Sequence, residues 1–193
     1  INDLSINGNQ PLVDQQNEVY LICNGEIYNH TSLIQQHDFS TFSSSDCEVI
    51  LHLYQKFGFE ETIKMLDGVF ALVLYDKKKD CIYIARDAFG IRPMFIGSSQ
   101  KEIGISSELK VISDICDSVE QFPAGCTLTL SNVSDYHSEQ KMLTLDSFRE
   151  KYQRWYHYVY ETPILQHTET EICQHINTLL VKTKSKKLSL NGK

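Results

Sequence analysis

The stretch Val69-Phe70-Ala71-Leu72-Val73-Leu74 is an unbroken run of six apolar residues. A run of this length is typical of a β-strand that is covered on both faces. A charged turn at residues 76–80 separates it from a second apolar run at residues 81–86, and together they predict an antiparallel hairpin. Because the first of these strands is expected to be covered on both faces, the sequence predicts a layered structure around it.

More strands are predicted on either side of this hairpin. Residues 94–96 and 102–106 form a second predicted hairpin, and residues 126–130 form a further strand. Upstream, residues 19–23 are apolar and partly β-branched, which predicts a strand that stops at a turn formed by Asn24-Gly25.

Two helices are predicted between the first strand and the hairpin. Ser45-Asp46-Cys47-Glu48 fits a capping box, and apolar residues at helical spacing follow it until Gly58. A short second helix is predicted at residues 60–65. Because the strands and the helices are grouped separately along the chain, the predicted fold class is α+β rather than alternating βαβ units.

The character of the sequence changes in its last quarter, where two further helices are predicted. The first carries four aromatic residues on one face: Phe148, Tyr152, Trp155 and Tyr156. The second begins at the capping box Thr168-Glu169-Thr170-Glu171 and carries four aliphatic residues on one face: Ile172, Ile176, Leu179 and Leu180. Such faces indicate helices that pack against a neighbouring domain.

Charge and hydropathy exclude several classes of function. The 193 residues hold 18 Lys and Arg against 25 Asp and Glu, which gives a net charge of −7 and a pI near 5.5. An acidic chain repels phosphate backbones, so nucleic acid is not an expected partner. There is no apolar run long enough to span a membrane and no targeting segment, so we expect a cytoplasmic protein without a membrane partner.

The six cysteines do not predict a metal site. They are Cys23, Cys47, Cys81, Cys116, Cys126 and Cys173, and no two of them form a C-x-x-C pair. Without that spacing neither a zinc site nor a redox pair is indicated, and the scattered histidines match no metal spacing. We expect reduced thiols that mostly pack as small apolar side chains, and no metal.

The residues with the clearest chemical potential are Asn24-Gly25-Glu26, at the end of a predicted strand, and Asp46, at the start of a predicted helix. A side-chain amide and a backbone N–H beside an open turn can donate two hydrogen bonds to one developing oxyanion. Two nearby carboxylates could receive an α-ammonium group. The residues alone leave a plainer alternative open, since Asn-Gly often forms a turn and an Asp is favoured at a helix start by the helix dipole.

Six motifs in the first 130 residues resemble, in the same order, the class II glutamine amidotransferase domain of asparagine synthetases. They are Asn24-Gly25-Glu26-Ile27-Tyr28-Asn29-His30, Ser45-Asp46-Cys47-Glu48-Val49-Ile50, Leu66-Asp67-Gly68-Val69-Phe70-Ala71, Ala85-Arg86-Asp87-Ala88-Phe89-Gly90-Ile91-Arg92-Pro93, Ser107-Glu108-Leu109-Lys110 and Phe122-Pro123-Ala124-Gly125. Each motif alone is a weak signal, but as an ordered set they are specific. The first motif favours asparagine synthetases over phosphoribosyl or sugar-phosphate amidotransferases.

The resemblance implies roles for individual residues. Asn24 and Gly25 would form the oxyanion hole, and Glu26 and Asp46 would hold the α-amino group of glutamine. The family fold is an N-terminal-nucleophile-type, four-layer αββα sandwich.

The start of the chain also acquires an expected role from the resemblance. Ile1 and Asn2 would line the glutamine pocket through their backbone. The family nucleophile is an N-terminal cysteine whose α-amine is the base, and it would align upstream of Ile1, as would the arginine that binds the substrate carboxylate. We therefore expect a sandwich that is incomplete at its N-terminus, and an isolated chain that is inactive because it has no acyl-forming thiolate.

The resemblance also implies a domain organisation. Residues 1–141 would be the glutaminase domain, and residues 142–193 a helical interdomain linker with the truncated start of an ATP-dependent synthetase domain. The whole enzyme would hydrolyse glutamine and transfer the ammonia to ATP-activated aspartate. ATP and Mg²⁺ would belong to the missing synthetase domain, no cofactor would bind this chain, and the family implies a homodimer.

Two alternative functions remain open at this stage. The chain could be an amidotransferase-like binding or dimerisation module without catalysis. It could also be the glutaminase half of a related ATP-dependent amidotransferase that uses a different acceptor.

Overall fold

The computed structural model describes residues 3–99, 102–137, 144–157 and 167–190, and the side chains of all of these except residues 136–137 and 186–190. The chain divides into two compact units, Ile1–His157 and Tyr158–Lys193, each of which is considered by itself.

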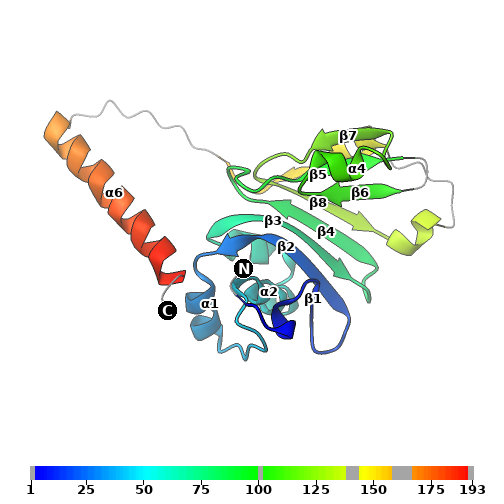
Figure 1. Cartoon of the computed structure of the whole chain (residues 1–193), viewed down its shortest axis with the longest axis horizontal. Coiled ribbons are helices and arrows are strands. Elements are labelled where there is room, and N and C mark those ends of the chain that lie inside the picture. The colour runs from blue at the N-terminus through cyan, green and yellow to red at the C-terminus, as the bar shows by residue number, and fades with distance from the viewer. Residues whose placement is uncertain (1–2, 100–101, 138–143, 158–166, 191–193) are drawn as a thin grey trace. The chain divides into compact units, whose positions relative to one another are not determined.

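The first unit is built on a six-stranded antiparallel sheet. Its strands, in spatial order, are β1 (Leu12–Val13), β2 (Val19–Ile27), β3 (Gly68–Asp76), β4 (Cys81–Arg86), β8 (Cys126–Ser131) and β9 (Gln153–Arg154). The apolar run that opened the sequence argument lies in β3, between β2 and β4, at the centre of this sheet (Figure 1). The predicted hairpin of β3 and β4 is therefore confirmed, with Asp76 opposite Cys81 at its turn.

A three-stranded antiparallel sheet packs on one face of the larger sheet. Its strands, in spatial order, are β6 (Ile103–Ser106), β5 (Phe95–Ser98) and β7 (Ser118–Gln121). The apolar core between the two sheets includes Ala71, Ile84, Ile96 and Phe122. The predicted second hairpin is confirmed as β5 paired with β6.

Helices cover the outer faces of both sheets. The larger sheet is covered by α1 (His30–His37), α2 (Val49–Phe57) and α3 (Phe59–Met65), and the smaller one by α4 (Leu109–Ile112) (Figure 1). Gly104 makes room for α4, since a Cβ at this position would lie 3.0 Å from Ile112 Cγ2. The layers are thus helix, sheet, sheet, helix, and the expected α+β sandwich of the N-terminal-nucleophile type is confirmed.

The remaining short elements are η1 (Ile6–Gly8), η2 (Asp46–Glu48), η3 (Val133–His137) and α5 (Leu145–Arg149). The predicted helix end at Gly58 is confirmed, with Gly58 at a φ of 80°. The predicted capping box at Ser45 is wrong, because the Ser45 side chain makes no capping hydrogen bond. The Glu48 carboxylate instead accepts hydrogen bonds from the loop before the helix, from the backbone N–H of Phe42 at 2.8 Å and of Ser43 at 2.7 Å.

The strand predicted to stop at residue 23 continues through Asn24 and Gly25 to Ile27. Asn24 pairs with Ala71 and Gly25 with Phe70, so this part of β2 belongs to the ladder with β3. The long apolar β3 offers a partner along its whole length, and that pairing outweighs the local preference of Asn-Gly for a turn.

The predicted aromatic helix is also wrong. Helix α5 ends at Arg149, and β9 pairs with β8, with Arg154 opposite Cys126. The Trp155 indole N–H donates to the carbonyl of Arg86 at 3.1 Å, which ties this segment to β4. The first unit accordingly runs to His157, beyond the boundary at residue 141 that the sequence suggested.

The second unit contains one described helix, α6 (Glu169–Leu190). Its predicted capping box is confirmed: the Thr168 N–H donates to the Glu171 carboxylate at 2.8 Å, and the Glu171 N–H donates to Thr168 Oγ1 at 3.4 Å. The aliphatic face predicted for this helix is exposed to solvent at Ile176 and Leu179. Across the described residues, no helix combines the length and the apolar character needed to cross a bilayer.

Candidate functional site: a polar cavity at the outer edge of β2

The backbone of Gly25 faces away from β3. In the ladder Gly25 lies opposite Phe70, and the Phe70 carbonyl accepts the N–H of Asp87 at 2.8 Å on the β4 side. In an antiparallel strand the backbone N–H and C=O of one residue point to the same edge of the strand. Two directly opposed residues either both point these groups toward each other or both point them away from each other, and Phe70 points its carbonyl away from β2. The N–H of Gly25 is therefore directed to the outer edge of β2.

The neighbouring positions on this edge are occupied by side chains. The N–H of Cys23 donates to Gln10 Oε1 at 2.8 Å, and Gln10 Nε2 donates to the Cys23 carbonyl at 2.8 Å. The N–H of Ile27 donates to Asp46 Oδ2 at 2.6 Å. Gly25 lies between these two satisfied positions, where β1 has already ended.

A cavity of about 500 Å³ opens at this point. Its described lining residues are Asp3, Leu4, Gly8, Asn9, Gln10, Cys23, Asn24, Gly25, Glu26, Ser45, Asp46, Cys47 and Arg92. Four of the sequence-predicted site residues, Asn24, Gly25, Glu26 and Asp46, are thus brought together. The other two, Ile1 and Asn2, lie outside the described residues.

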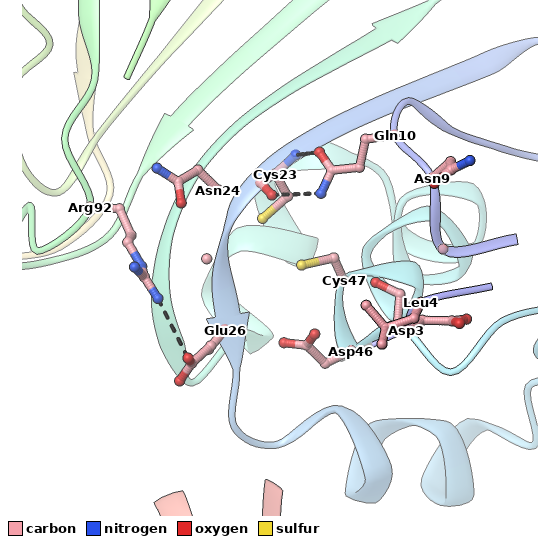
Figure 2. A pocket seen from close by; sticks show the side chains of 13 residues that line it. Asp3, Leu4, Asn9, Gln10, Cys23, Asn24, Glu26, Asp46, Cys47 and Arg92 are labelled. Carbon is pink, nitrogen blue, oxygen red and sulfur yellow. Dashed lines mark hydrogen bonds and ion pairs between the residues drawn. The ribbon is translucent and has the colours of Figure 1, made fainter. Parts of the chain in front are cut away.

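The cavity draws on both faces of β2, because side chains alternate along a strand. Figure 2 shows Asn24, Glu26 and Arg92 on one side of the strand and Cys23, Cys47 and Asp46 on the other. Gly25 cannot carry a side chain at the crossing point, since a Cβ there would lie 2.5 Å from the Val69 carbonyl oxygen.

The two predicted carboxylates occupy different environments. Asp46, at the start of η2, is 4% exposed and is fixed by the Ile27 N–H. Glu26 is half-exposed, and its Oε1 lies 3.5 Å from Nη2 of Arg92. The cavity therefore offers one rigid acidic group and one that is balanced by a cation.

Arg92 belongs to one of the sequence motifs but had no predicted role in the site. The loop that carries it is held by Asp87, whose carboxylate accepts the backbone N–H of Ile91 at 3.0 Å and of Arg92 at 3.2 Å. Arg86 adds a third restraint, because its Nε donates to the Arg92 carbonyl at 2.8 Å. The spacing Arg86-Asp87-x₄-Arg92 contained this signal, but only the folded loop brings Arg92 next to Glu26.

Gln10, Cys23 and Cys47 were likewise not assigned to the site. Cys23 and Cys47 belong to the apolar core, as expected for most cysteines, and they also form part of the cavity wall. The neighbouring Cys47 thiol, together with burial, raises the pKa of Cys23 well above its ordinary value. Cys23 is therefore a protonated thiol and a poor nucleophile.

No group of three or more His, Cys, Asp or Glu side chains gathers into a possible metal site within the described part of the chain. The described lining of the cavity does offer an amide from Asn24, an outward backbone N–H from Gly25, one guanidinium, and the carboxylates of Asp3, Glu26 and Asp46. Donors next to carboxylates fit a ligand that has a carbonyl at one end and an ammonium group at the other.

The fold and this cavity define a class: amidotransferases with an N-terminal-nucleophile-type sandwich. A glutamine phosphoribosylpyrophosphate amidotransferase from B. subtilis matches 80% of this chain and 33% of its own, with a TM-score of 0.63 and 24% identity. A structure described as the allosteric regulatory enzyme of purine biosynthesis matches 78% of this chain and 32% of its own, with a TM-score of 0.60 and 23% identity.

The family model for the glutamine amidotransferase domain matches residues 1–147, and the chain belongs to this family. The glutamine-hydrolysing asparagine synthetase of Asparagus officinalis is 43% identical over 122 residues, which are 61% of this chain and 20% of that protein. Asparagine synthetase 2 of Arabidopsis thaliana is 46% identical over 122 residues, 61% of this chain and 21% of that protein. The match thus spans about a fifth of the length of these curated relatives.

Proposed function

We propose that the cavity at the outer edge of β2 binds glutamine, and that the chain supplies the glutamine-binding half of a glutamine-hydrolysing asparagine synthetase. The main support for this proposal is that one cavity is lined by Asn24, Gly25, Glu26 and Asp46. The likeness to asparagine synthetases at 43–46% identity supports the choice of enzyme.

Each residue has a role that follows from its chemistry. The Asn24 amide and the outward Gly25 N–H donate to the side-chain carbonyl of glutamine, and they bind more strongly as that oxygen becomes negative. Asp46 and Glu26 accept the α-ammonium group, with Asp46 held in place by the Ile27 N–H. Binding at both ends fixes the amide carbon at one position in the cavity.

The chemistry of the whole enzyme extends beyond these groups. Glutamine would be hydrolysed by a cysteine thiolate, and the ammonia would attack an aspartate activated by ATP and Mg²⁺ in a synthetase domain. Five cysteines of this chain, all except Cys173, are buried. Two of them, Cys23 and Cys47, line the cavity, and the Cys47 thiol together with burial raises the pKa of Cys23, which makes Cys23 a poor nucleophile. We accordingly expect the 193-residue chain alone to bind glutamine without hydrolysing it. As a separate expectation from the family, the glutaminase domains of the whole enzyme would form a homodimer.

Calorimetric titration of glutamine into the chain tests the proposal. Asp46→Asn should weaken binding by about tenfold or more, because it removes a buried charge that faces the ammonium group. Glu26→Gln should weaken it less, since Glu26 is half-exposed and already balanced by Arg92. The exposed Asp114 serves as the control, and Asp114→Asn should leave the affinity unchanged.

Four outcomes are informative. Glutamine binding that Asp46→Asn does not weaken would contradict the assigned site, and no binding would contradict the proposed function. Release of glutamate above the level of the Glu26→Ala, Asp46→Ala double variant would contradict the expected inactivity of this chain. Binding without hydrolysis agrees with the proposal.

A further inference from the structure

Strand β1 does not extend as far as the cavity. It covers two residues and pairs with the outer edge of β2, with Leu12 opposite Leu21. If the same register continued, Gln10 would lie opposite Cys23, the next residue of β2 whose backbone groups face outward. The backbone of Gln10 is not part of the strand, and its side chain takes the place of that pairing.

The Gln10 side chain makes the hydrogen bonds of a strand partner. Its Oε1 accepts the Cys23 N–H at 2.8 Å, and its Nε2 donates to the Cys23 carbonyl at 2.8 Å. Two residues exchange the same pair of bonds in an antiparallel ladder, because a side-chain amide offers the acceptor and the donor of a peptide group. Gln10 thus satisfies the edge of β2 at Cys23 without a strand beside it.

The backbone that precedes Gln10 turns away from β2. Gly8 would be the residue opposite Gly25 if the register of β1 continued. It lies instead in η1, where its N–H donates to the Ser5 carbonyl at 3.1 Å. Gly8 therefore forms part of the cavity wall, and the N–H of Gly25 faces the cavity rather than a neighbouring strand.

The segment that forms this part of the wall is also held on its other side. The Asp3 carboxylate accepts the Ser44 N–H at 2.8 Å, and Asn7 Nδ2 donates to the Phe42 carbonyl at 3.1 Å. Gln10 ties the same segment to β2. It therefore fixes the position of this wall relative to the strand.

We propose that Gln10 is a positioning residue of the cavity: its side-chain amide ends the ladder of β1 and β2 in place of a peptide group, and so leaves the Gly25 N–H available to the carbonyl of a ligand. Gln10 acts through Cys23 and through the wall segment, and it needs no contact with the ligand. The inference rests on the proposed function for the identity of that ligand, glutamine.

Calorimetric titration of glutamine into variants of the 193-residue chain tests the inference. Gln10→Ala removes both hydrogen bonds and should weaken glutamine binding by about three- to tenfold, because the wall loses its link to β2. Because Gln10 is exposed to solvent, its replacement should leave the chain folded, which thermal unfolding checks. A Gln10→Ala chain that binds glutamine as tightly as the unaltered chain would overturn the inference.

A second variant separates the role of the amide from a general loss of structure. At about pH 7 the carboxylate of Gln10→Glu can accept the Cys23 N–H but repels the Cys23 carbonyl, so binding should again be weaker. A protonated carboxyl group offers one donor and one acceptor, as the amide does. The affinity relative to the unaltered chain at the same pH should therefore recover as the pH falls to about 4.5.

Two further variants should show no such recovery. Gln10→Ala has no group that protonation could restore. Asn9→Asp is the matched control, because it adds the same charge to the adjacent residue of the cavity wall. A Gln10→Glu deficit that does not change with pH would overturn the inference.

Hydrogen exchange on the ligand-free chain keeps this inference separate from the proposed function. The Cys23 amide should exchange about tenfold faster or more in Gln10→Ala, whereas the Ile27 amide, which Asp46 holds, should be unchanged. A Cys23 amide that exchanges equally slowly in Gln10→Ala would overturn the inference whatever the chain binds. If the unaltered chain binds no glutamine, the proposed function fails and the Cys23 exchange rate alone decides the role of Gln10.

Discussion

Gly25 has no room for a side chain between β2 and β3. Its closest neighbours would be backbone atoms, with Val69 O at 2.5 Å and Phe70 Cα at 2.8 Å from an added Cβ. Backbone atoms in the centre of a sheet cannot move aside as a flexible side chain can. We therefore expect Gly25→Ala to push the two strands apart at the point where the Gly25 N–H faces the cavity.

The expected cost of Gly25→Ala is about 1–3 kcal/mol in the free energy of unfolding, measured by urea denaturation. Thr129→Ala, at an exposed position of β8, is the control and should cost much less. A Gly25→Ala chain of unchanged stability would show that β2 and β3 pack less closely than described here.

Glu48 stabilises the start of α2 in a pH-dependent way. Burial alone raises the pKa of Glu48, but hydrogen bonds from His52, Ser43 and the Phe42 backbone outweigh it and hold the pKa below its ordinary value of 4.5. Since the folded chain binds this proton less tightly than the unfolded chain, the stabilisation is fully present above about pH 4.5 and is lost as the pH falls through the lowered pKa.

Glu48→Gln should accordingly lower the free energy of unfolding by about 1–3 kcal/mol at pH 7. The difference from the unaltered chain should shrink as the pH falls below about 4.5, as followed by denaturation at a series of pH values. Glu150→Gln, at an exposed position, should show no such dependence. A difference that stays constant with pH would contradict the role given to the Glu48 charge.

Among the elements, those with a strong local pattern were predictable from the sequence, and those formed by distant pairing were not. The β3–β4 hairpin and the N-terminal cap of α6 are determined by residues close together in the sequence. The extension of β2 through Asn24-Gly25 and the formation of β9 depend on strands far away in the sequence. Both predictions were wrong because they followed the local conformational preference of the residues, whereas pairing with a strand distant in the sequence determines the structure.

The candidate site was predictable to a similar extent. Asn24, Gly25, Glu26 and Asp46 stood out through their motifs, and they do line one cavity. Arg92 and Gln10 could not be assigned from the sequence, because each reaches the cavity from a loop that only the fold brings there. The position of Arg92 depends on the Asp87 carboxylate, which accepts hydrogen bonds from the backbone N–H groups of Phe89, Ile91 and Arg92 in one turn.

On the scale of the whole molecule, the first compact unit should fold without the second. The unit ends at His157, and α5 and β9 contribute to it through the fully buried Phe148 and the pairing with β8. A chain of residues 1–157 is therefore expected to unfold at nearly the same temperature as the whole chain. A chain of residues 1–141 should be much less stable, because it loses that packing.

Circular dichroism during heating measures both truncations against the whole chain. Equal stability of residues 1–141 and 1–157 would contradict the packing described for α5 and β9. A large loss in residues 1–157 would contradict the division at His157.

The most direct test of the central claim is to locate bound glutamine by nuclear magnetic resonance on the ¹⁵N-labelled chain. Because the Gly25 N–H is expected to donate to the glutamine carbonyl, its amide resonance should shift among the most on titration, together with that of Ile27, whose N–H is held by Asp46. Amides of β9, on the far edge of the sheet, should not move. Saturable shifts confined to other residues, with the Gly25 amide unmoved, would contradict the account.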